Sequence, residues 1–307
     1  MLRASRLWML GIRHARTGTA VAVHRPLWGC SHEHVLSASK IAVLHNGIMT
    51  APALPQSPRR IRAEILIVLG LSLGMSALYA IVNIINRATR DVPLSQQTAS
   101  INVSRDQREI FDLLYQLLGI VAALVPVALV IFLLWQPQRP HLGRLGIDGT
   151  RPWRDTRDGV GLAALIGIPG LFVYLGGREL GLTVTVVPTD LGAYWWTVPV
   201  LLLAAVRAGV LEEVIAVGYL FARLRELGWR PWAIIVTSSL LRGAYHLYQG
   251  VGAFVGNFLM GIVFGWLYQR FGRLMPLVIA HTALDAVIFV GYPWAAAAFP
   301  AVFGVPG

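Results

Sequence analysis

The sequence has one cysteine, Cys30, and one lysine, Lys40, among its 307 residues. A single thiol excludes a disulfide within the chain and any metal site built from several cysteines. Charged residues are also few, at 13%, whereas 56% of the residues are hydrophobic. This balance excludes an ordinary soluble globular domain and predicts an all-α, polytopic membrane protein.

Acidic residues are scarcer than basic ones, since 15 aspartates and glutamates face 26 lysines and arginines, for a formal net charge of +11. In a membrane protein such an excess indicates cytoplasmic loops that lie beside anionic lipid headgroups. The lipid bilayer is therefore the expected partner of this charge, and a nucleic-acid partner is not expected.

The first 48 residues differ from the rest of the chain, because they hold the cysteine, the lysine and five of the eight histidines. Met49 opens a short polar lead followed by Arg59, Arg60 and Arg62, an arrangement that commonly precedes a first membrane span. We therefore expect residues 1–48 to be an atypical extension, unstructured or upstream of the true start at Met49. A cleaved presequence and a flexible basic tail are the alternatives.

From residue 63 onward, apolar runs alternate with short polar loops, and each run is long enough to cross a hydrocarbon core of about 30 Å. We predict seven membrane helices and a short eighth segment at 295–303. The seven runs cover residues 63–85, 110–135, 159–176, 194–221, 231–248, 252–268 and 274–292. The expected fold is a transmembrane helical bundle of about seven to eight helices.

The arginines predict how this bundle is divided and oriented. Four arginine-rich segments fall on every second connection, which predicts that they face the cytoplasm. They lie at 59–62, 139–157, 223–230 and 270–273. The loop 87–108 carries four arginines on the opposite side and is the weak point of this assignment.

Three segments follow from this division of the chain. We assign residues 49–157 to two N-terminal helices and an arginine-rich loop, 158–293 to a core, and 294–307 to a C-terminal tail. Tryptophans near the ends of the runs, among them Trp195, Trp196 and Trp229, fit interfacial anchors.

The sixth run carries two pairs of glycines at a spacing that lets helix backbones approach closely, Gly252 with Gly256 and Gly261 with Gly265. We predict that it is a packing helix. The same spacing is common in membrane helices, so it indicates no chemistry.

Two adjacent carboxylates, Glu212 and Glu213, stand in the middle of the fourth run, within residues 209–219. At the centre of a membrane helix each acid costs roughly 2.5–3.5 kcal/mol on insertion scales, so acids kept there usually have a function. Two further runs carry polar pairs four residues apart, which share a helix face and are expected to point into the bundle. These pairs are Arg242 with His246 and His281 with Asp285.

Carboxylates and imidazoles from three spans are expected to converge. Such groups can position and deprotonate a water molecule, or they can hold a divalent metal, and the residues alone leave both open. Arg207 lies on the fourth run but off the face of the acids, so we expect it near a cavity or a partner helix rather than in the site.

Three motifs in this order resemble those of the CPBP intramembrane proteases, a family that includes the CAAX prenyl endopeptidases. The motif Glu-Glu-x-x-x-Arg is similar to the stretch from Glu212 to Val217, and Phe-x-x-x-His is similar to Arg242 to His246. The third motif, His-x-x-x-Asn or Asp, matches His281 to Asp285. The resemblance spans about residues 158–293 and is placed in an actinobacterial-like branch.

The resemblance implies an intramembrane endopeptidase that cleaves a peptide bond by attack of water. Carried over by position, Glu212 is the general base that holds the water with His246, while Glu213 orients the site. His281 and Asp285 then stabilise the oxyanion or complete a metal site. The metal alternative is zinc or another divalent ion on Glu213, His246 and His281, and hydrolysis without a metal stays open.

Two positions depart from the family pattern, since Val217 stands where it has arginine and Arg242 where it has phenylalanine. We hypothesise that Arg242 supplies from the fifth run the positive charge that the fourth run lost, pairing with Glu213. The opposing interpretation is that catalysis has decayed and the chain is an inactive scaffold or immunity protein.

The sequence therefore predicts a multi-pass protease of a bacterial plasma membrane that acts on a membrane-associated protein or peptide. The main alternative is a proton-coupled transporter in which Glu212, Glu213 and Asp285 form a relay across the membrane. No internal repeat pairs two halves of the chain, which disfavours the transporter.

Overall fold

The computed structural model of the chain describes residues 56–135 and 141–299. The predicted extension 1–48, the start at Met49 and part of the predicted segment 295–303 lie outside these ranges. The described residues are helical almost throughout, and strands are short, so the prediction of an all-α fold is confirmed.

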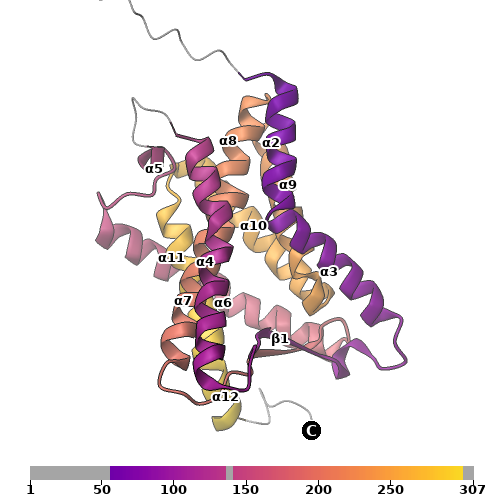
Figure 1. The fold of residues 1–307 in the computed structure, drawn as a ribbon. Coiled ribbons are helices and arrows are strands. Elements are labelled where there is room, and N and C mark those ends of the chain that lie inside the picture. The colour runs from indigo at the N-terminus through magenta and orange to yellow at the C-terminus, as the bar shows by residue number, and fades with distance from the viewer. Residues whose placement is uncertain (1–55, 136–140, 300–307) are drawn as a thin grey trace, which may run out of the picture. The chain divides into compact units, whose positions relative to one another are not determined.

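Each of the seven predicted runs is helical in the structure (Figure 1). The main helices are α2 (Pro58–Gly70), α3 (Leu73–Ala88), α4 (Glu109–Leu133), α6 (Pro152–Glu179), α7 (Thr197–Glu212), α8 (Leu220–Glu226), α9 (Pro231–His246), α10 (Val251–Phe271), α11 (Met275–Ala286) and α12 (Tyr292–Ala298). The π-helical segments η2 (Glu213–Tyr219) and η4 (Val287–Gly291) join α7 to α8 and α11 to α12. The short helices are η1 (Leu94–Gln96), α5 (His141–Arg144) and η3 (Leu247–Gln249).

Not every helix is long enough to cross a membrane alone. Among the described residues four helical stretches are long and apolar enough, namely α4, α6, α10 and the stretch from α11 to residue 295. The first predicted run is broken into α2 and α3, which meet at 56° and would form a fifth span together. The helices that carry Glu212 and Arg242, α7 and α9, have 16 residues each.

The short eighth segment is not a separate helix in the residues that the structure describes. Helix α12 ends at Ala298 and continues from α11 through η4, so its first residues extend the seventh run. The prediction that a separate segment begins at residue 295 was therefore wrong, because this residue lies within α12.

Apolar side chains cover the outside of the bundle. Tyr79 on α3 is 73% exposed and Phe132 on α4 is 68% exposed, and large apolar side chains of α6 and α7 are exposed in the same way. Side chains of this kind are stable outside a protein only when lipid or another protein covers them. Together with the long apolar helices, this surface identifies a multi-pass membrane protein.

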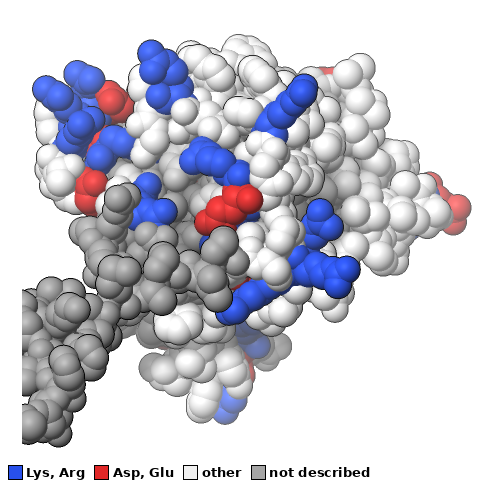
Figure 2. Space-filling view, turned by 90° about the horizontal axis from the view of Figure 1, so that it is seen from above, with Lys and Arg blue, Asp and Glu red and all other residues white. Residues whose placement is uncertain are grey.

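The arginine-rich segments meet at one end of the bundle. Arg223 on α8 donates to Glu64 on α2 (Nε–Oε1 2.7 Å) and to the carbonyl oxygen of Leu133 at the end of α4 (2.9 Å). Arg225 donates to Gln269 on α10 (2.9 Å). Figure 2 looks onto this end and shows basic side chains spread over it, with few acidic ones between them.

A second ionic contact at this end holds the loop after α5. Arg273 donates to Asp155 in the first turn of α6 (Nη2–Oδ2 2.6 Å) and to Asp148 in the loop (Nη2–Oδ1 3.0 Å). Thr150 also donates to Asp148 through its hydroxyl and its backbone N–H. Hydrogen bonds from the Arg273 guanidinium and from Thr150 hold the pKa of Asp148 well below its usual range.

At the opposite end, two strands that the sequence did not predict pair in parallel. Strand β1 (Thr98–Asn102) lies beside β2 (Thr185–Thr189), with Thr98 opposite Thr185 and Asn102 opposite Thr189. They tie the loop before α4 to the loop before α7. Trp196 lies in this region, where it is buried and its indole N–H donates to Glu109 (3.2 Å), so its assignment as an interfacial anchor was wrong.

Three of the four arginines in the loop 87–108 are bound locally. Arg87 donates to Asn83 (2.7 Å) and to the carbonyl oxygen of Thr98 (2.9 Å). Arg90 donates to Asn86 (3.2 Å), and Arg108 forms an ion pair with Asp106 (3.1 Å). These contacts explain how this loop can hold so many arginines, because each of the three already has a partner.

Close helix packing brings the polar spans together. A Cβ atom on Gly209 of α7 would lie 3.0 Å from the carbonyl oxygen of Val278 on α11, and one on Gly261 of α10 would lie 2.8 Å from the Ser239 hydroxyl on α9. Only glycine allows these approaches. The prediction that the sixth run is a packing helix is thus confirmed for Gly261.

Candidate active site

The fourth run changes its helix type between the two carboxylates. Glu212 is the last residue of α7, and Glu213 is the first residue of the π-helical segment η2. A π-helical turn is wider than an α-helical one and often occurs at functional sites. The Ser238 hydroxyl on α9 donates to the carbonyl oxygen of Ala216 within this segment (2.7 Å), which fixes the widened turn against α9.

Glu213 lies in a fully buried ion cluster with Arg242 and His281. Its Oε1 atom accepts a hydrogen bond from Arg242 Nη2 (2.7 Å) and another from His281 Nδ1 (2.7 Å). Because a carboxylate oxygen only accepts, the Nδ1 atom of His281 carries a proton. The hypothesis that Arg242 pairs with Glu213 is confirmed as a contact. We call these three residues the inner cluster.

Glu212 lies one residue away but is more open. The Tyr245 hydroxyl on α9 donates to its Oε2 atom (2.6 Å), and Arg242 Nη1 lies 3.5 Å from the same oxygen. The other oxygen, Oε1, has no hydrogen-bond partner in the described part of the chain. The side chain of Glu212 is 14% exposed, whereas that of Glu213 is 0% exposed.

His246 follows Arg242 by one helical turn and shares its face. Its Nδ1 atom lies 2.9 Å from the carbonyl oxygen of Arg242, which can only accept, so Nδ1 donates. In a neutral ring the lone pair is then on Nε2. The ring lies against that of Tyr245, with centroids 4.7 Å apart, and interacts electrostatically with Glu212.

Asp285 completes the predicted set from α11. Its Oδ2 atom lies 3.7 Å from His281 Nε2, and Glu212 Oε2 lies 3.8 Å from the same nitrogen. Both separations exceed hydrogen-bond length, so neither carboxylate occupies Nε2. We call Glu212, Tyr245, His246 and Asp285 the open site, which contacts the inner cluster through His281.

All six residues selected from the sequence therefore lie in one region of the bundle. Tyr245 was missed, although it directly precedes His246 and lies in the same helical turn. A tyrosine in an apolar run gives no signal by itself, and only its contact with Glu212 makes it part of the site. Val217, which replaces the family's arginine, is buried among apolar side chains.

The residues assigned to a metal do not fit one as they are placed, because the Arg242 cation contacts Glu213 directly and neutralises it. The Nδ1–H groups of both histidines donate to oxygen acceptors, so only their Nε2 atoms could bind an ion. Glu213 Oε2 is buried without a partner, but one oxygen is no metal site. Among the described residues no group of three or more histidines, cysteines or acids could hold an ion. The metal stays a prediction, and no step below depends on it.

Comparison with known proteins finds a family model that matches this part of the chain. Residues 194–287 match the family model described as Rce1-like, type II CAAX prenyl endopeptidase. The matched residues include both the inner cluster and the open site. No curated protein and no solved structure matches the chain. The resemblance inferred from the three motifs is thus confirmed, while the actinobacterial-like branch stays a prediction.

Proposed function

We propose that this chain, whose residues 194–287 match the Rce1-like family model and whose motifs resemble those of the CPBP membrane proteases, is an intramembrane endopeptidase that uses an activated water. The observation that carries the proposal is the free Oε1 atom of Glu212 beside His246. One oxygen of this carboxylate is held by Tyr245 at 2.6 Å, so the other is oriented and available. Glu and His are the usual general bases near neutral pH.

The attacking water has two O–H groups, and the open site offers two acceptors for them. Glu212 accepts one through its free oxygen, and His246 accepts the other through Nε2, because its Nδ1 atom donates to the backbone. Glu212 takes the first proton as the water oxygen bonds to the carbonyl carbon. The bond between that carbon and the peptide nitrogen then breaks, and Glu212 returns the proton to the leaving amine.

The negative charge on the former carbonyl oxygen needs a donor. His281 is suited to this role, since its Nδ1–H is fixed on Glu213 and its Nε2 faces Glu212 and Asp285. With both nitrogens protonated, the ring donates from Nε2 to the oxyanion. Asp285 is one turn further along α11 and orients or neutralises this ring.

Arg242 supports the site by positioning rather than by chemistry. It neutralises Glu213, which in turn orients His281, and its backbone carbonyl oxygen accepts the hydrogen bond from His246 Nδ1. In this proposal Arg242 takes the place of the arginine that the family has at position 217. The substrate is a membrane-associated protein or peptide, because the site lies among apolar helices.

The transporter alternative has less support. A relay across the membrane needs acidic groups at successive depths. Here Glu212, Glu213 and Asp285 gather around a single histidine, at 3.8, 2.7 and 3.7 Å from the His281 ring nitrogens. This arrangement is a cluster rather than a chain of groups.

The proposal is tested with purified full-length protein in lipid nanodiscs and a library of membrane-anchored peptides. Wild-type protein should cleave a subset of the peptides, and Glu212→Gln should abolish cleavage. Glu179→Gln is the matched control, because Glu179 is an exposed carboxylate outside the site. Cleavage that is equal in Glu212→Gln and wild type would contradict the proposal.

Two further measurements on the same preparation separate the alternatives. Uptake into liposomes that depends on a proton gradient and is lost in Glu212→Gln would favour the transporter. Metal analysis of wild type and of His246→Ala tests the metal prediction, which requires that the variant lose a bound ion.

A further inference from the structure

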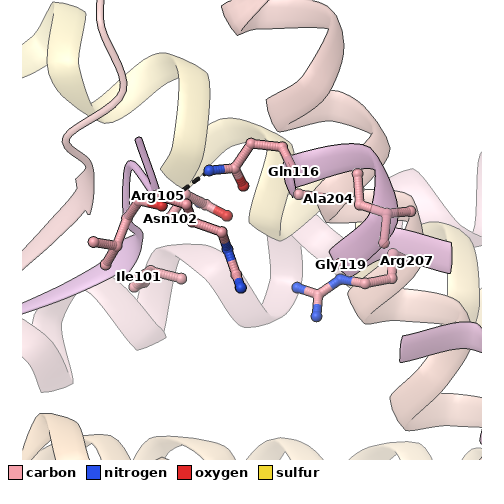
Figure 3. Close-up of a pocket in the computed structure, with 9 residues that line it drawn as sticks. Ile101, Asn102, Arg105, Gln116, Gly119, Ala204 and Arg207 are labelled. Carbon is pink, nitrogen blue, oxygen red and sulfur yellow. Dashed lines mark hydrogen bonds between the residues drawn. The ribbon is translucent and has the colours of Figure 1, made fainter. Parts of the chain in front are cut away.

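A second polar region lies beside the open site and takes no part in the proposed hydrolysis. It is a cavity of about 370 Å³ between the chain after β1, α4 and α7. Arg105, from the loop before α4, and Arg207, from α7, line the cavity and point into the same open space (Figure 3). The expectation that Arg207 lies near a cavity is confirmed.

Neither guanidinium forms a hydrogen bond or a close ion pair with an acid among the residues that the structure describes, although Arg207 interacts electrostatically with Asp285. Arg207 Nε is buried without a hydrogen bond, and Arg105 reaches Asp112 with its backbone N–H but not with its side chain. Arg87 and Arg108 in the same loop, by contrast, are both bound. No aspartate or glutamate lines the cavity. Two cations that face one cavity without a bound acid attract an anion.

The other lining residues indicate what kind of anion fits. A planar guanidinium matches the two oxygens of a carboxylate. Ile101, Ile120 and Ala204 add an apolar wall, which suits an anion attached to an aliphatic chain. Gly119 leaves the space open, since a Cβ atom there would lie 3.7 Å from Arg105 Nη2.

The position of the cavity connects it with the open site. Arg207 precedes Glu212 by five residues on one helix, which is about 7.5 Å along the axis and about 140° around it, so the two side chains leave different faces of α7. An extended peptide spans about 3.3 Å per residue, so two to four residues would bridge this distance. Arg207 also interacts electrostatically with Asp285.

The depth of the cavity favours a peptide over a lipid headgroup. Next to Gly119 on α4, Leu118 and Val121 expose apolar side chains, at 62% and 64%. The α4 wall of the cavity therefore lies at the level of lipid chains, deeper than the loop that supplies Arg105.

We propose that the cavity between Arg105 and Arg207 binds a carboxylate of the peptide substrate, about two to four residues from the bond that is hydrolysed. The carboxylate comes from an aspartate or glutamate side chain or from the peptide's C-terminus. This inference rests on the proposed function, because it assigns the cavity to the substrate of the open site.

Binding is measured with the cleavage-inactive Glu212→Gln protein, full length and in phosphatidylcholine nanodiscs, so that the peptides stay intact. The probes are three fluorescent leucine–alanine peptides of one length. The first carries one glutamate and a C-terminal amide, the second a glutamine and an amide, and the third a glutamine and a free C-terminal carboxylate. At least one acidic peptide should bind about tenfold more tightly than the neutral one, and which one does so identifies the source of the carboxylate.

Variants of the lining residues test whether the cavity causes the preference for the acidic peptide. Arg207→Gln and Arg105→Gln should each reduce it, the double variant should remove it, and Arg207→Lys should keep part of it. Gly119→Leu keeps both charges but fills the cavity, and should also weaken binding of the acidic peptide. The matched control is Arg154→Gln, which removes an exposed arginine at the other end of the bundle. Thermal unfolding of each variant checks that it is folded.

Three results would overturn the inference. The first is that the acidic and neutral peptides bind equally well to the protein that has both arginines. The second is that the preference for the acidic peptide survives in the Arg105→Gln/Arg207→Gln double variant. The third is that mass spectrometry finds phosphatidylglycerol bound to the protein with both arginines but not to the double variant, while neither protein prefers the acidic peptide. Cleavage by the wild-type protein separates this inference from the proposed function. If the protein cleaves peptides but shows no preference for acidic ones, only the role of the cavity is contradicted. If it prefers acidic peptides but cleaves none, only the proposed protease activity is contradicted.

Discussion

Glu212 and Glu213 are neighbours in the sequence, yet the structure places them in opposite surroundings. Glu213 is fully buried, and its Oε1 atom accepts hydrogen bonds from both Arg242 and His281, each at 2.7 Å. Glu212 is partly exposed, holds Tyr245 on one oxygen and leaves the other free. The inner cluster thus uses its carboxylate for assembly, whereas the open site keeps one available.

The difference arises from helix geometry and shows how a membrane protein can keep two acids side by side. Adjacent residues on a helix point in directions about 100° apart, so one can face the bundle centre and the other a cavity. A buried carboxylate is stable only when it is paired and hydrogen-bonded. Arg242 meets this need for Glu213, which leaves Glu212 free for chemistry.

The largest expected effect comes from removing the cation of the inner cluster. Arg242→Met leaves the buried Glu213 with a hydrogen bond from His281 but without its arginine, and breaking such a pair costs about 3–5 kcal/mol. We expect a large drop in the unfolding temperature in detergent together with loss of cleavage. A stable and active Arg242→Met protein would show that the inner cluster is not needed for assembly.

A paired variant sharpens this test. Val217→Arg in an Arg242→Phe background restores the family's arrangement, in which the arginine is on the fourth run. We expect it to recover part of the stability and activity that Arg242→Phe alone loses. If Arg242→Phe alone is harmless, the two departures from the family pattern do not compensate each other.

The next effect is on activity alone. In His246→Asn, the amide can still donate to the carbonyl oxygen of Arg242, but the acceptor at Nε2 is gone. We expect cleavage to fall by roughly 10²–10⁴-fold with little change in unfolding temperature. His246→Gln places a polar atom near the Nε2 position and should retain more activity than His246→Asn. Equal activities of the two variants would remove His246 Nε2 from the mechanism.

Tyr245→Phe should have a smaller effect on both quantities. It removes one hydrogen bond to a charged group, worth about 1.5–3 kcal/mol, and leaves Glu212 in place. We expect reduced cleavage and a modest fall in unfolding temperature, measured beside Tyr79→Phe, which alters an exposed tyrosine. Unchanged cleavage in Tyr245→Phe would mean that the hydroxyl does not orient the base.

The smallest effect is expected at the ionic contact on the surface, far from both sites. The pKa of Asp148 is lowered by Arg273 and Thr150, so the charged form stabilises the folded state above the unfolded-state pKa of about 3.9. This contribution is lost as the pH falls through the lowered folded-state pKa. The unfolding temperatures of wild type and Asp148→Asn should therefore differ slightly at pH 7 and converge in acid. A difference that grows in acid would contradict the assignment.

Much of the fold followed from the sequence, because membrane helices are set by long apolar runs and by internally satisfied backbones. Pro231 marks the start of α9 as predicted, and all seven runs are helical. The break between α2 and α3 was missed, although Gly70, Ser72 and Gly74 lie at it, because small residues are also common in unbroken membrane helices. The two strands were missed because they are short and occur in polar loops.

The site was predicted from charge in an apolar setting, and the structure brings together Glu212, Glu213, Arg242 and His281 as contacts. The separate surroundings of the two acids could not be predicted, because they depend on which side chains of α9 and α11 contact each acid. Tyr245 and the two-arginine cavity were also beyond the sequence. Each depends on which elements pack together rather than on spacing within one helix.

The most direct test compares two variants that differ only in which carboxylate is neutralised. Glu212→Gln and Glu213→Gln are measured side by side for cleavage of the same peptide and for unfolding temperature. We expect Glu212→Gln to be inactive with near wild-type stability, and Glu213→Gln to lose stability because Arg242 remains buried without its anion. The opposite pattern, an active Glu212→Gln and a stable but inactive Glu213→Gln, would contradict the division between the open site and the inner cluster.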